Sequence, residues 1–236
     1  MFRHNMKKLL SFAKRRPIIF CLLAVIIGYG CVVGRFLFWP QVSPLAKENP
    51  ATTAFIEYRK AQWKEAGKDV KLRWTWKNLN QISPHLKQAV VVAEDNKFRQ
   101  HSGFDWEGIR DAFMTNLAKR RLSAGGSTIS QQLAKNLWLS PEKSITRKLQ
   151  EAVLTMRLEM ELDKDRILEL YLNVVEWGDG VFGAEAAARH YFGVSAARLN
   201  KWQSASLAAM LPSPLKRKPD TGIMKRLGRT VYNRMH

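Results

Sequence analysis

The sequence is short of cysteine and of acidic residues, and both shortages narrow what the protein can be. Its 236 residues include only two cysteines, Cys21 and Cys31, and both lie inside an apolar run. This arrangement offers neither a disulfide framework nor a cysteine-based zinc site. No collagen-like, heptad or solenoid repeat runs through the chain. With 46% hydrophobic and 25% charged residues, the chain is not disordered, and its length suits one domain or one domain plus an appendage.

A long uncharged run dominates the N-terminal part of the chain. From Pro17 to Gly34 no residue is charged, and 18 helical residues at about 1.5 Å each nearly span the hydrocarbon core of a bilayer. The residues before this run are basic and include no acid, so the positive-inside rule predicts a cytoplasmic N-terminus and an outside location for everything after Trp39. We expect a basic cytoplasmic segment at 1–16, a transmembrane anchor at 17–39, a linker at 40–54 and a folded domain at 55–236.

A cleaved signal peptide is the alternative interpretation of the same run. The run is long for the apolar region of a signal peptide, and no Ala-x-Ala cleavage site follows it. The sequence therefore favours an uncleaved anchor.

The excess of positive charge is not confined to the flank of the anchor. The whole chain has a net charge of +19, and after Arg35 it still has 32 basic and 20 acidic residues. A basic domain at a membrane surface attracts phosphate-bearing partners. Nucleic acid is not expected outside the cell, so anionic lipid or a lipid-linked phosphate is the better prediction. If only the net charge is considered, a basic surface that contacts water and binds no ligand is an equally good explanation.

Beyond the linker, the hydrophobic spacing is helical and strand signals are nearly absent, so the predicted fold class is mainly α. An extended piece is expected at 72–76, a glycine-rich turn at 123–127, a glycine-containing loop at 178–183 and a weakly patterned basic tail from Lys216. Helices are expected at 55–67, from Ser83 onward, at 106–120, at 128–138, from Ser140 to Leu162, at 163–173, at 184–192 and at 201–211.

The segment EDNKFRQHSGFD at 94–105 is the first candidate for chemistry. Glu94 follows an apolar stretch, so it is expected where a helix leaves the core, and an apolar wall raises the proton affinity of a carboxylate toward that of a general base. Asp95, His101 and Asp105 are expected to hydrogen-bond and hold the following loop. For His101 this structural role is favoured over chemistry. The spacing of these residues lacks the tight pairs typical of metal ligands.

The segment GGSTISQQLAKN at 125–136 combines two glycines with a helix start. Free backbone N–H groups at such a start favour an anion, and Thr128, Gln132 and Lys135 are predicted to share one face of the helix. A phosphate or a phosphorylated sugar suits this combination. The segment is not a nucleotide P-loop, and an ordinary helix with a polar outer face is an equally good interpretation.

The segment RKLQE at 147–151 places Arg147, Lys148 and Glu151 within one helical turn. These three are predicted to lie opposite the buried face of their helix. They form either a solvated salt-bridged surface or, in a cleft, a site for pyrophosphate. The predicted buried stripe consists of Ile145, Leu149, Ala152, Val153 and Met156.

The segment from Tyr171 to Arg189 is rich in glycine and alanine, and core packing is the preferred interpretation for most of it. Serine chemistry has little support. Ser-x-x-Lys occurs three times, but the Ser-x-Asn and Lys-Thr-Gly partners of penicillin-binding transpeptidases are missing.

Taken in order, these segments resemble the five motifs of the peptidoglycan glycosyltransferase family, specifically its monofunctional, membrane-anchored, biosynthetic members. The matching segments are EDNKFRQHSGFD, GGSTISQQLAKN, RKLQE, LYLNVVEWGDGVFGAEAAARHYFG and the helix ending LAAMLPSP. Each motif alone is weak, but five in this order are specific. The resemblance covers about residues 80–215 together with the preceding anchor.

The resemblance implies a lysozyme-like, mainly α-helical fold with two lobes, and no transpeptidase domain. It implies polymerisation of lipid II into glycan strands for cell-wall biogenesis and cell shape. The donor is the growing strand held by undecaprenyl pyrophosphate, and the GlcNAc 4-hydroxyl of the acceptor attacks its C1 with inversion. The implied location is the inner membrane with the domain on its periplasmic face, and the implied partners are other cell-wall synthesis proteins. Moenomycin is the implied inhibitor.

The resemblance also assigns roles to individual residues. Glu94 matches the catalytic base, and Glu151 matches a second essential carboxylate that assists departure of pyrophosphate directly or through a cation. Asp95, Phe98 and His101 match residues that shape the first-motif loop of the substrate site. A divalent cation, Mg or Mn, is a possible assistant, although no metal site is evident in the sequence. Contacts to the sugar-pyrophosphate region are implied for Ser127, Thr128, Gln132, Lys135, Asn136, Arg147 and Lys148.

Two rival functions remain open at this point. A membrane-anchored, lysozyme-like lytic enzyme would act on finished peptidoglycan and would need no phosphate site. A non-catalytic cationic tether would leave Glu94 and Glu151 without a role.

Overall fold

The structure is a computed structural model that describes residues 16–118, 125–142, 144–217, 219 and 221–235. The chain divides into two compact units, 1–41 and 42–236, and each is described by itself. The first unit contains helix α2 (Pro17–Gly34), which a 3-10 turn (Arg35–Leu37) continues. Within the described residues, the stretch Pro17–Leu37 is the one helix that is long and apolar enough to cross a membrane. It fits the predicted anchor.

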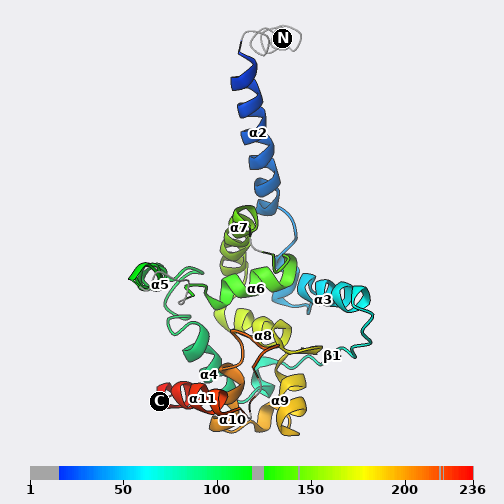
Figure 1. The fold of residues 1–236 in the computed structure, drawn as a ribbon, viewed down its shortest axis with the longest axis vertical. Helices are drawn as coiled ribbons and strands as arrows, with labels where there is room; N and C mark the ends of the chain where they lie inside the picture. The colour runs from blue at the N-terminus through cyan, green and yellow to red at the C-terminus, as the bar shows by residue number, and fades with distance from the viewer. Residues whose placement is uncertain (1–15, 119–124, 143, 218, 220, 236) are drawn as a thin grey trace. The chain divides into compact units, whose positions relative to one another are not determined.

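The second unit is mainly helical, as the sequence predicted (Figure 1). Short 3-10 turns lie at Ser43–Ala46, Leu79–Gln81 and Ala196–Arg198. The helices are α3 (Ala54–Glu65), α4 (Pro84–Glu94), α5 (Trp106–Ala118), α6 (Ile129–Trp138), α7 (Ile145–Glu161), α8 (Lys164–Val174), α9 (Ala184–Phe192), α10 (Lys201–Ala208) and α11 (Gly222–Arg234). The predicted turn at 123–127 and the end of the predicted helix 106–120 lie partly outside the described residues.

A small sheet takes up half of the predicted loop at 178–183. Its strands are β1 (Arg73–Trp74), β2 (Glu176–Gly178) and β3 (Val181–Phe182), in the order β1-β3-β2. Strand β3 pairs parallel to β1 and antiparallel to β2. Strand β1 confirms the extended piece predicted at 72–76. Strands β2 and β3 were not predicted, because strands of two or three residues are too short to show the alternation that identifies a strand in a sequence.

Two groups of packed helices position the candidate site. Helix α10 packs against α4 and α11, and α6 packs against α3, α7 and α8, as Figure 1 shows. Fully buried apolar side chains hold α4 and α6 in place, among them Leu86, Val90 and Leu133. The first and second motifs therefore lie on helices that are fixed by the core.

Side-chain caps set most helix starts. Ser83 caps α4, with Pro84 at the first helical position, and Thr128 forms a capping box with Gln131 at α6. The predicted start of α7 at Ser140 was wrong. The helix begins at Ile145 because the hydroxyl of Ser144 accepts the backbone N–H of Arg147 at 3.1 Å.

The predicted buried stripe of α7 was also wrong. Ile145 is 81% exposed, and Leu149 and Met156 are each 44% exposed. The buried residues of α7 are instead Glu151, Leu154, Thr155 and Leu158. The helix thus turns one carboxylate inward beside Leu154 and Leu158, which is tolerable because two cations of the same helix neutralise the buried Glu151.

Gly183, at the start of α9, should not tolerate a side chain. Its φ is +81°, and an added Cβ would lie 2.7 Å from the carbonyl oxygen of Asn173. Because both the backbone angle and the contact oppose a side chain, we expect Gly183→Ala to lower the free energy of unfolding by about 1–3 kcal/mol. Denaturant unfolding of the purified protein in detergent would measure the loss. Gly222→Ala is the matched control, since its Cβ would meet no atom within 4 Å, and an equal loss in both variants would contradict the explanation.

Candidate active site

Glu94 is the last residue of α4, where the helix leaves the core. Its carboxylate Oε2 accepts a hydrogen bond from Nε2 of Gln132 at 2.8 Å. Burial raises the pKa of Glu94 above its ordinary value, and the neighbouring charge of Asp95 raises it further. The hydrogen bond from Gln132 and the positive charges of Lys135 and Arg217 lower it again without cancelling the effect of burial. A carboxylate with raised proton affinity beside positive charge is suited to act as a general base.

A buried tyrosine fixes the direction of the Gln132 amide. The hydroxyl of Tyr171 on α8 donates to Oε1 of Gln132 at 2.9 Å. Tyr171 is fully buried, and burial raises its pKa well above the ordinary value, so it stays neutral and keeps its proton to donate. With its oxygen occupied, Gln132 presents its NH₂ group to Glu94.

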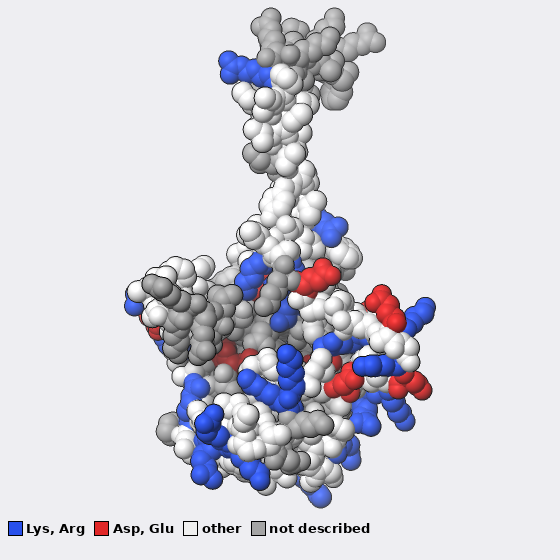
Figure 2. Space-filling view, in the orientation of Figure 1, with Lys and Arg blue, Asp and Glu red and all other residues white. Residues whose placement is uncertain are grey.

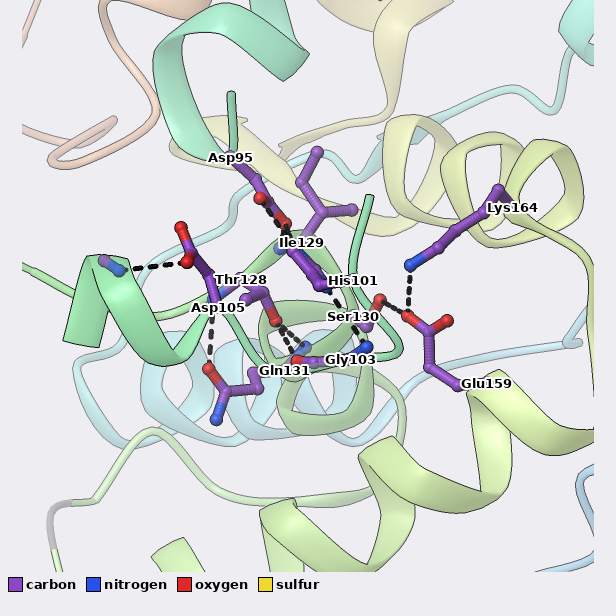
Figure 3. A network of polar contacts seen from close by, with 11 residues as sticks. Asp95, His101, Gly103, Asp105, Thr128, Ile129, Ser130, Gln131, Glu159 and Lys164 are labelled. Carbon is purple, nitrogen blue, oxygen red and sulfur yellow. Dashed lines mark hydrogen bonds and ion pairs between the residues drawn. The ribbon is translucent and has the colours of Figure 1, made fainter. Parts of the chain in front are cut away.

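Asp95 of the first motif forms hydrogen bonds with residues of both the first and the second motif. Its Oδ2 accepts the backbone N–H of Ile129 at 3.0 Å, and its Oδ1 lies 2.9 Å from Nε2 of His101. The N–H of Gly103 donates to Nδ1 of His101 at 3.2 Å, so Nε2 bears the proton that points to Asp95. Figure 3 shows these groups converging at the start of α6. The structural role predicted for His101 is therefore confirmed, with a carboxylate as its main partner.

The start of α6 is occupied by groups of the chain itself. The hydroxyl of Thr128 donates to the carbonyl of Gly103 at 2.7 Å and accepts the N–H of Gln131 at 3.2 Å. Together with Asp95 on Ile129 and Gln131 on Thr128, these bonds use the backbone N–H groups of Thr128, Ile129 and Gln131, which are therefore not offered to a substrate anion. Thr128 is 2% exposed and acts as a cap here, so it does not share the open face of Gln132 and Lys135.

A second polar cluster supports the first-motif loop from behind. Glu159 on α7 accepts hydrogen bonds from Ser130 and from Lys164, the latter at 2.7 Å (Figure 3). The ammonium of Lys164 lies 4.5 Å from the ring centre of Phe98, which is fully buried. Phe98 thus shapes the loop from inside, as the sequence predicted.

The third motif forms a buried ion cluster on α7. Glu151, 3% exposed, accepts a hydrogen bond from Arg147 at 2.6 Å and another from Lys148. The Lys148 ammonium also lies 3.5 Å from the hydroxyl of Ser127. Of the two interpretations left open by the sequence, the buried cluster favours a site over a solvated surface.

Lys135 connects the two carboxylates. Burial lowers the pKa of Lys135, the charges of Arg147 and Lys148 lower it further, and the charges of Glu151 and Glu94 oppose this. The ammonium therefore lies within electrostatic reach of both the first and the third motif. Lys135 thus links the electrostatics of Glu94 with those of the ion cluster in which Arg147 and Lys148 contact Glu151.

A cleft of about 310 Å³ opens beside this region. Gln132, Lys135 and Asn136 of α6 form one wall, and the segment Leu211–Lys216 and residues of α3 and β2 form the others. This volume is at the lower end of the range for small-ligand sites, about 300–1,000 Å³. Across the visible face of the second unit, Lys and Arg side chains gather in the lower part of the view (Figure 2).

The donor groups do not form a metal site. Among the described residues, no group of three or more His, Cys, Asp or Glu side chains is placed to hold a metal ion. Glu94 and Glu151 are each engaged by nitrogen donors of the chain. A divalent cation bound only by substrate oxygens would need no such group, so its assistance stays a prediction.

Several residues of the site were not predicted. Tyr171 and Glu176 were assigned to the core, and they are indeed buried, but both also reach functional groups. Arg59 and Arg217 were not singled out at all. Arg59 contacts Glu176, 117 residues away, and the charge of Arg217 acts on Glu94 from a distant part of the sequence, so no local pattern could have indicated either link.

The fold and the site define a helical enzyme that combines a carboxylate base with a buried cationic region beside a cleft. The sequence profile of the transglycosylase family matches residues 61–236. The chain is 53% identical over 194 residues to the biosynthetic peptidoglycan transglycosylase of Laribacter hongkongensis, covering 82% of each chain. It is 55% identical over 176 residues to that of Azoarcus sp. (strain BH72), covering 75% of this chain and 76% of the relative. It is 48% identical over 199 residues to that of Nitrosospira multiformis, covering 84% of each.

The chain belongs to the transglycosylase family. The predicted family and the lysozyme-like, mainly helical fold class are thereby confirmed.

Proposed function

We propose that this protein is a peptidoglycan glycosyltransferase that polymerises lipid II into glycan strands. The observation that carries the proposal is the geometry of α6, where Gln132 donates a hydrogen bond to Glu94 at 2.8 Å and Lys135, three residues later, lines the same cleft as Gln132. The direction of the Lys135 pKa shift agrees with this arrangement, because the charges of Glu94, Glu151, Arg147 and Lys148 all contribute to it. A transferase that uses a pyrophosphate leaving group needs a base and a cationic region in one site. The relatives named above are all biosynthetic, and none of them supports the lytic alternative.

The proposed reaction is a single inverting displacement. Glu94 takes the proton of the acceptor GlcNAc 4-hydroxyl as its oxygen forms a bond to C1 of the donor sugar. The bond from C1 to the pyrophosphate oxygen breaks, and undecaprenyl pyrophosphate leaves with the electron pair. Lys135, Arg147 and Lys148 stabilise the negative charge of the departing group. Glu151 holds the last two cations in place.

The membrane setting is part of the proposal. Helix α2 anchors the chain in the inner membrane, and the basic residues before it favour a cytoplasmic N-terminus and a periplasmic domain. Helix α5 exposes Trp106, Phe113, Met114 and Leu117, each more than half accessible. A group of exposed apolar side chains of this kind is suited to contact with lipid, where a lipid-linked substrate is found.

Incubation of the purified full-length protein with fluorescent lipid II tests the proposal. We expect glycan strands to form and moenomycin to block their formation. A parallel incubation with finished, lipid-free peptidoglycan should release no soluble fragments. Fragment release without consumption of lipid II would favour the lytic enzyme, and inactivity toward both substrates would favour the cationic tether.

A further inference from the structure

One buried carboxylate in the wall of the cleft has an unused oxygen. Glu176 of β2 lines the cleft and is only 4% exposed. Its Oε2 accepts two hydrogen bonds from Arg59 of α3, from Nε at 3.1 Å and from Nη2 at 2.8 Å. Its Oε1 is buried and has no hydrogen-bond partner among the described residues. Buried polar atoms without a partner are rare in folded proteins, and each needs an explanation.

Arg59 cannot turn to satisfy the second oxygen as well. Its remaining Nη1 donates to Oε1 of Gln62 at 2.7 Å, and Gln62 in turn donates to the hydroxyl of Tyr58 at 3.0 Å. The guanidinium also lies over the ring of Phe55, 5.4 Å from its centre. Arg59 is therefore held on three sides, and none of its described hydrogen bonds reaches the free oxygen. Because Glu176 lines the cleft, a molecule bound there can supply the missing donor.

The other walls of the cleft suit a sugar ring. Gln132, Lys135 and Asn136 provide polar groups on one side, and Phe55, Leu211 and Pro212 provide apolar surface. A pyranose ring has a similar arrangement of polar and apolar groups. Its hydroxyl and acetamido N–H donors lie at the rim of the ring, and its C–H groups lie on the two faces. The polar wall is also the wall that includes the partner of Glu94.

We propose that Glu176 is a specificity-determining residue, whose free oxygen accepts a hydrogen bond from a hydroxyl or acetamido N–H group of a sugar unit in this cleft. The proposal rests on the glycosyltransferase function proposed above and adds to it a residue outside the base and the cationic region. Arg59 is the positioning residue, because its two hydrogen bonds to one oxygen leave the other oxygen for the sugar.

The variant Glu176→Gln tests this assignment because it reverses the polarity at one atom. Arg59 has only donors, so it will hold the amide oxygen, and the NH₂ group will take the place of the free acceptor. The NH₂ group then faces the hydroxyl or acetamido N–H of the sugar, and two donors cannot form a hydrogen bond with each other. We expect the KM for lipid II to rise at least about tenfold with little change in kcat, since a hydrogen bond to a charged group is lost in substrate binding. The exposed carboxylate of Glu57 provides the control, and Glu57→Gln should keep the wild-type KM.

A second variant covers the case in which Glu176→Gln leaves Arg59 without a negative charge beside it and the protein unfolds. The double variant Arg59→Met/Glu176→Met replaces the buried pair by side chains of similar length, an exchange that proteins often tolerate. It should show the same rise in KM. A wild-type KM in a folded variant would overturn the proposal, as would a loss of kcat and thermal stability with unchanged KM, which marks a purely structural ion pair. Wild-type protein that does not polymerise lipid II would instead overturn the proposed function.

Discussion

The Glu94→Gln variant is expected to lose lipid II polymerisation while keeping its fold. The amide cannot take a proton from the acceptor hydroxyl, and general-base catalysis typically contributes a factor of 10²–10⁴, so the rate should fall at least about 100-fold. The fold should persist because the amide oxygen can still accept the hydrogen bond from Gln132, which now joins Glu94 at 2.8 Å. Initial rates of lipid II consumption measure the loss, and circular dichroism checks the helical content.

The same exchange at an exposed position provides the control. Glu65 lies on the surface at the end of α3, and Glu65→Gln should polymerise lipid II at the wild-type rate. Full activity in Glu94→Gln would refute the assignment of the base. An equal loss in the two variants would indicate general damage to the protein.

The Glu151→Gln variant is expected to be nearly inactive for a different reason. Glu151 is 3% exposed and anchors Arg147 and Lys148 through its two oxygens. Removing its charge leaves two neighbouring cations to repel each other and to move away from the position where the pyrophosphate is proposed to leave. We expect kcat to fall at least about 100-fold, as for the loss of one charge-stabilising group in an active site. Loss of one partner of a buried ion pair should also cost about 3 kcal/mol of folding free energy, since Lys148 remains half exposed and is screened by water.

A carboxylate farther along the same helix provides the comparison for Glu151. Glu161 forms an ion pair with Arg157 near the end of α7, at a partly exposed position. Glu161→Gln should retain wild-type kcat and lose little stability. If Glu151→Gln turned over lipid II at the wild-type rate, the buried ion cluster would have no part in the reaction.

The helices that hold the site were predictable because their signals are local. Ser83 with Pro84 marked the start of one helix, and two glycines marked the start of another, and α4 and α6 begin at these places. The candidate site residues Glu94, Lys135 and Glu151 could be predicted because each belongs to a compact motif. Helix α11 was missed because the basic tail was interpreted as weakly patterned, although its buried residues Met224, Gly228 and Val231 lie four and three residues apart on one face.

The contacts between motifs could not be predicted from the sequence. Tyr171 reaches Gln132 across 39 residues, and Arg59 reaches Glu176 across 117, so only the folded chain shows these pairs. The face of α7 that turns inward was predicted wrongly for a related reason. Hydrophobic spacing assumes that only apolar residues pack inside, but the buried face of α7 includes Glu151 beside Leu154 and Leu158. The two cations that make this burial tolerable are identified only by the folded structure.

The central claim is that Glu94 and the cationic region form one site, and the pKa of Glu94 tests it most directly. Carbon-13 NMR of the glutamate side-chain carboxyls, with Glu94 assigned by its absence in Glu94→Gln, can follow the titration without any turnover. Burial should place this pKa above the ordinary glutamate value of 4.5, and the nearby Lys135 lowers it. In Lys135→Met the favourable charge is gone, so Glu94 should hold its proton to a still higher pH. Lys60→Met, at an exposed lysine of α3, should change nothing. An identical pKa of Glu94 in the wild type and in Lys135→Met would contradict the account, because the base and the cationic region would then be electrostatically separate.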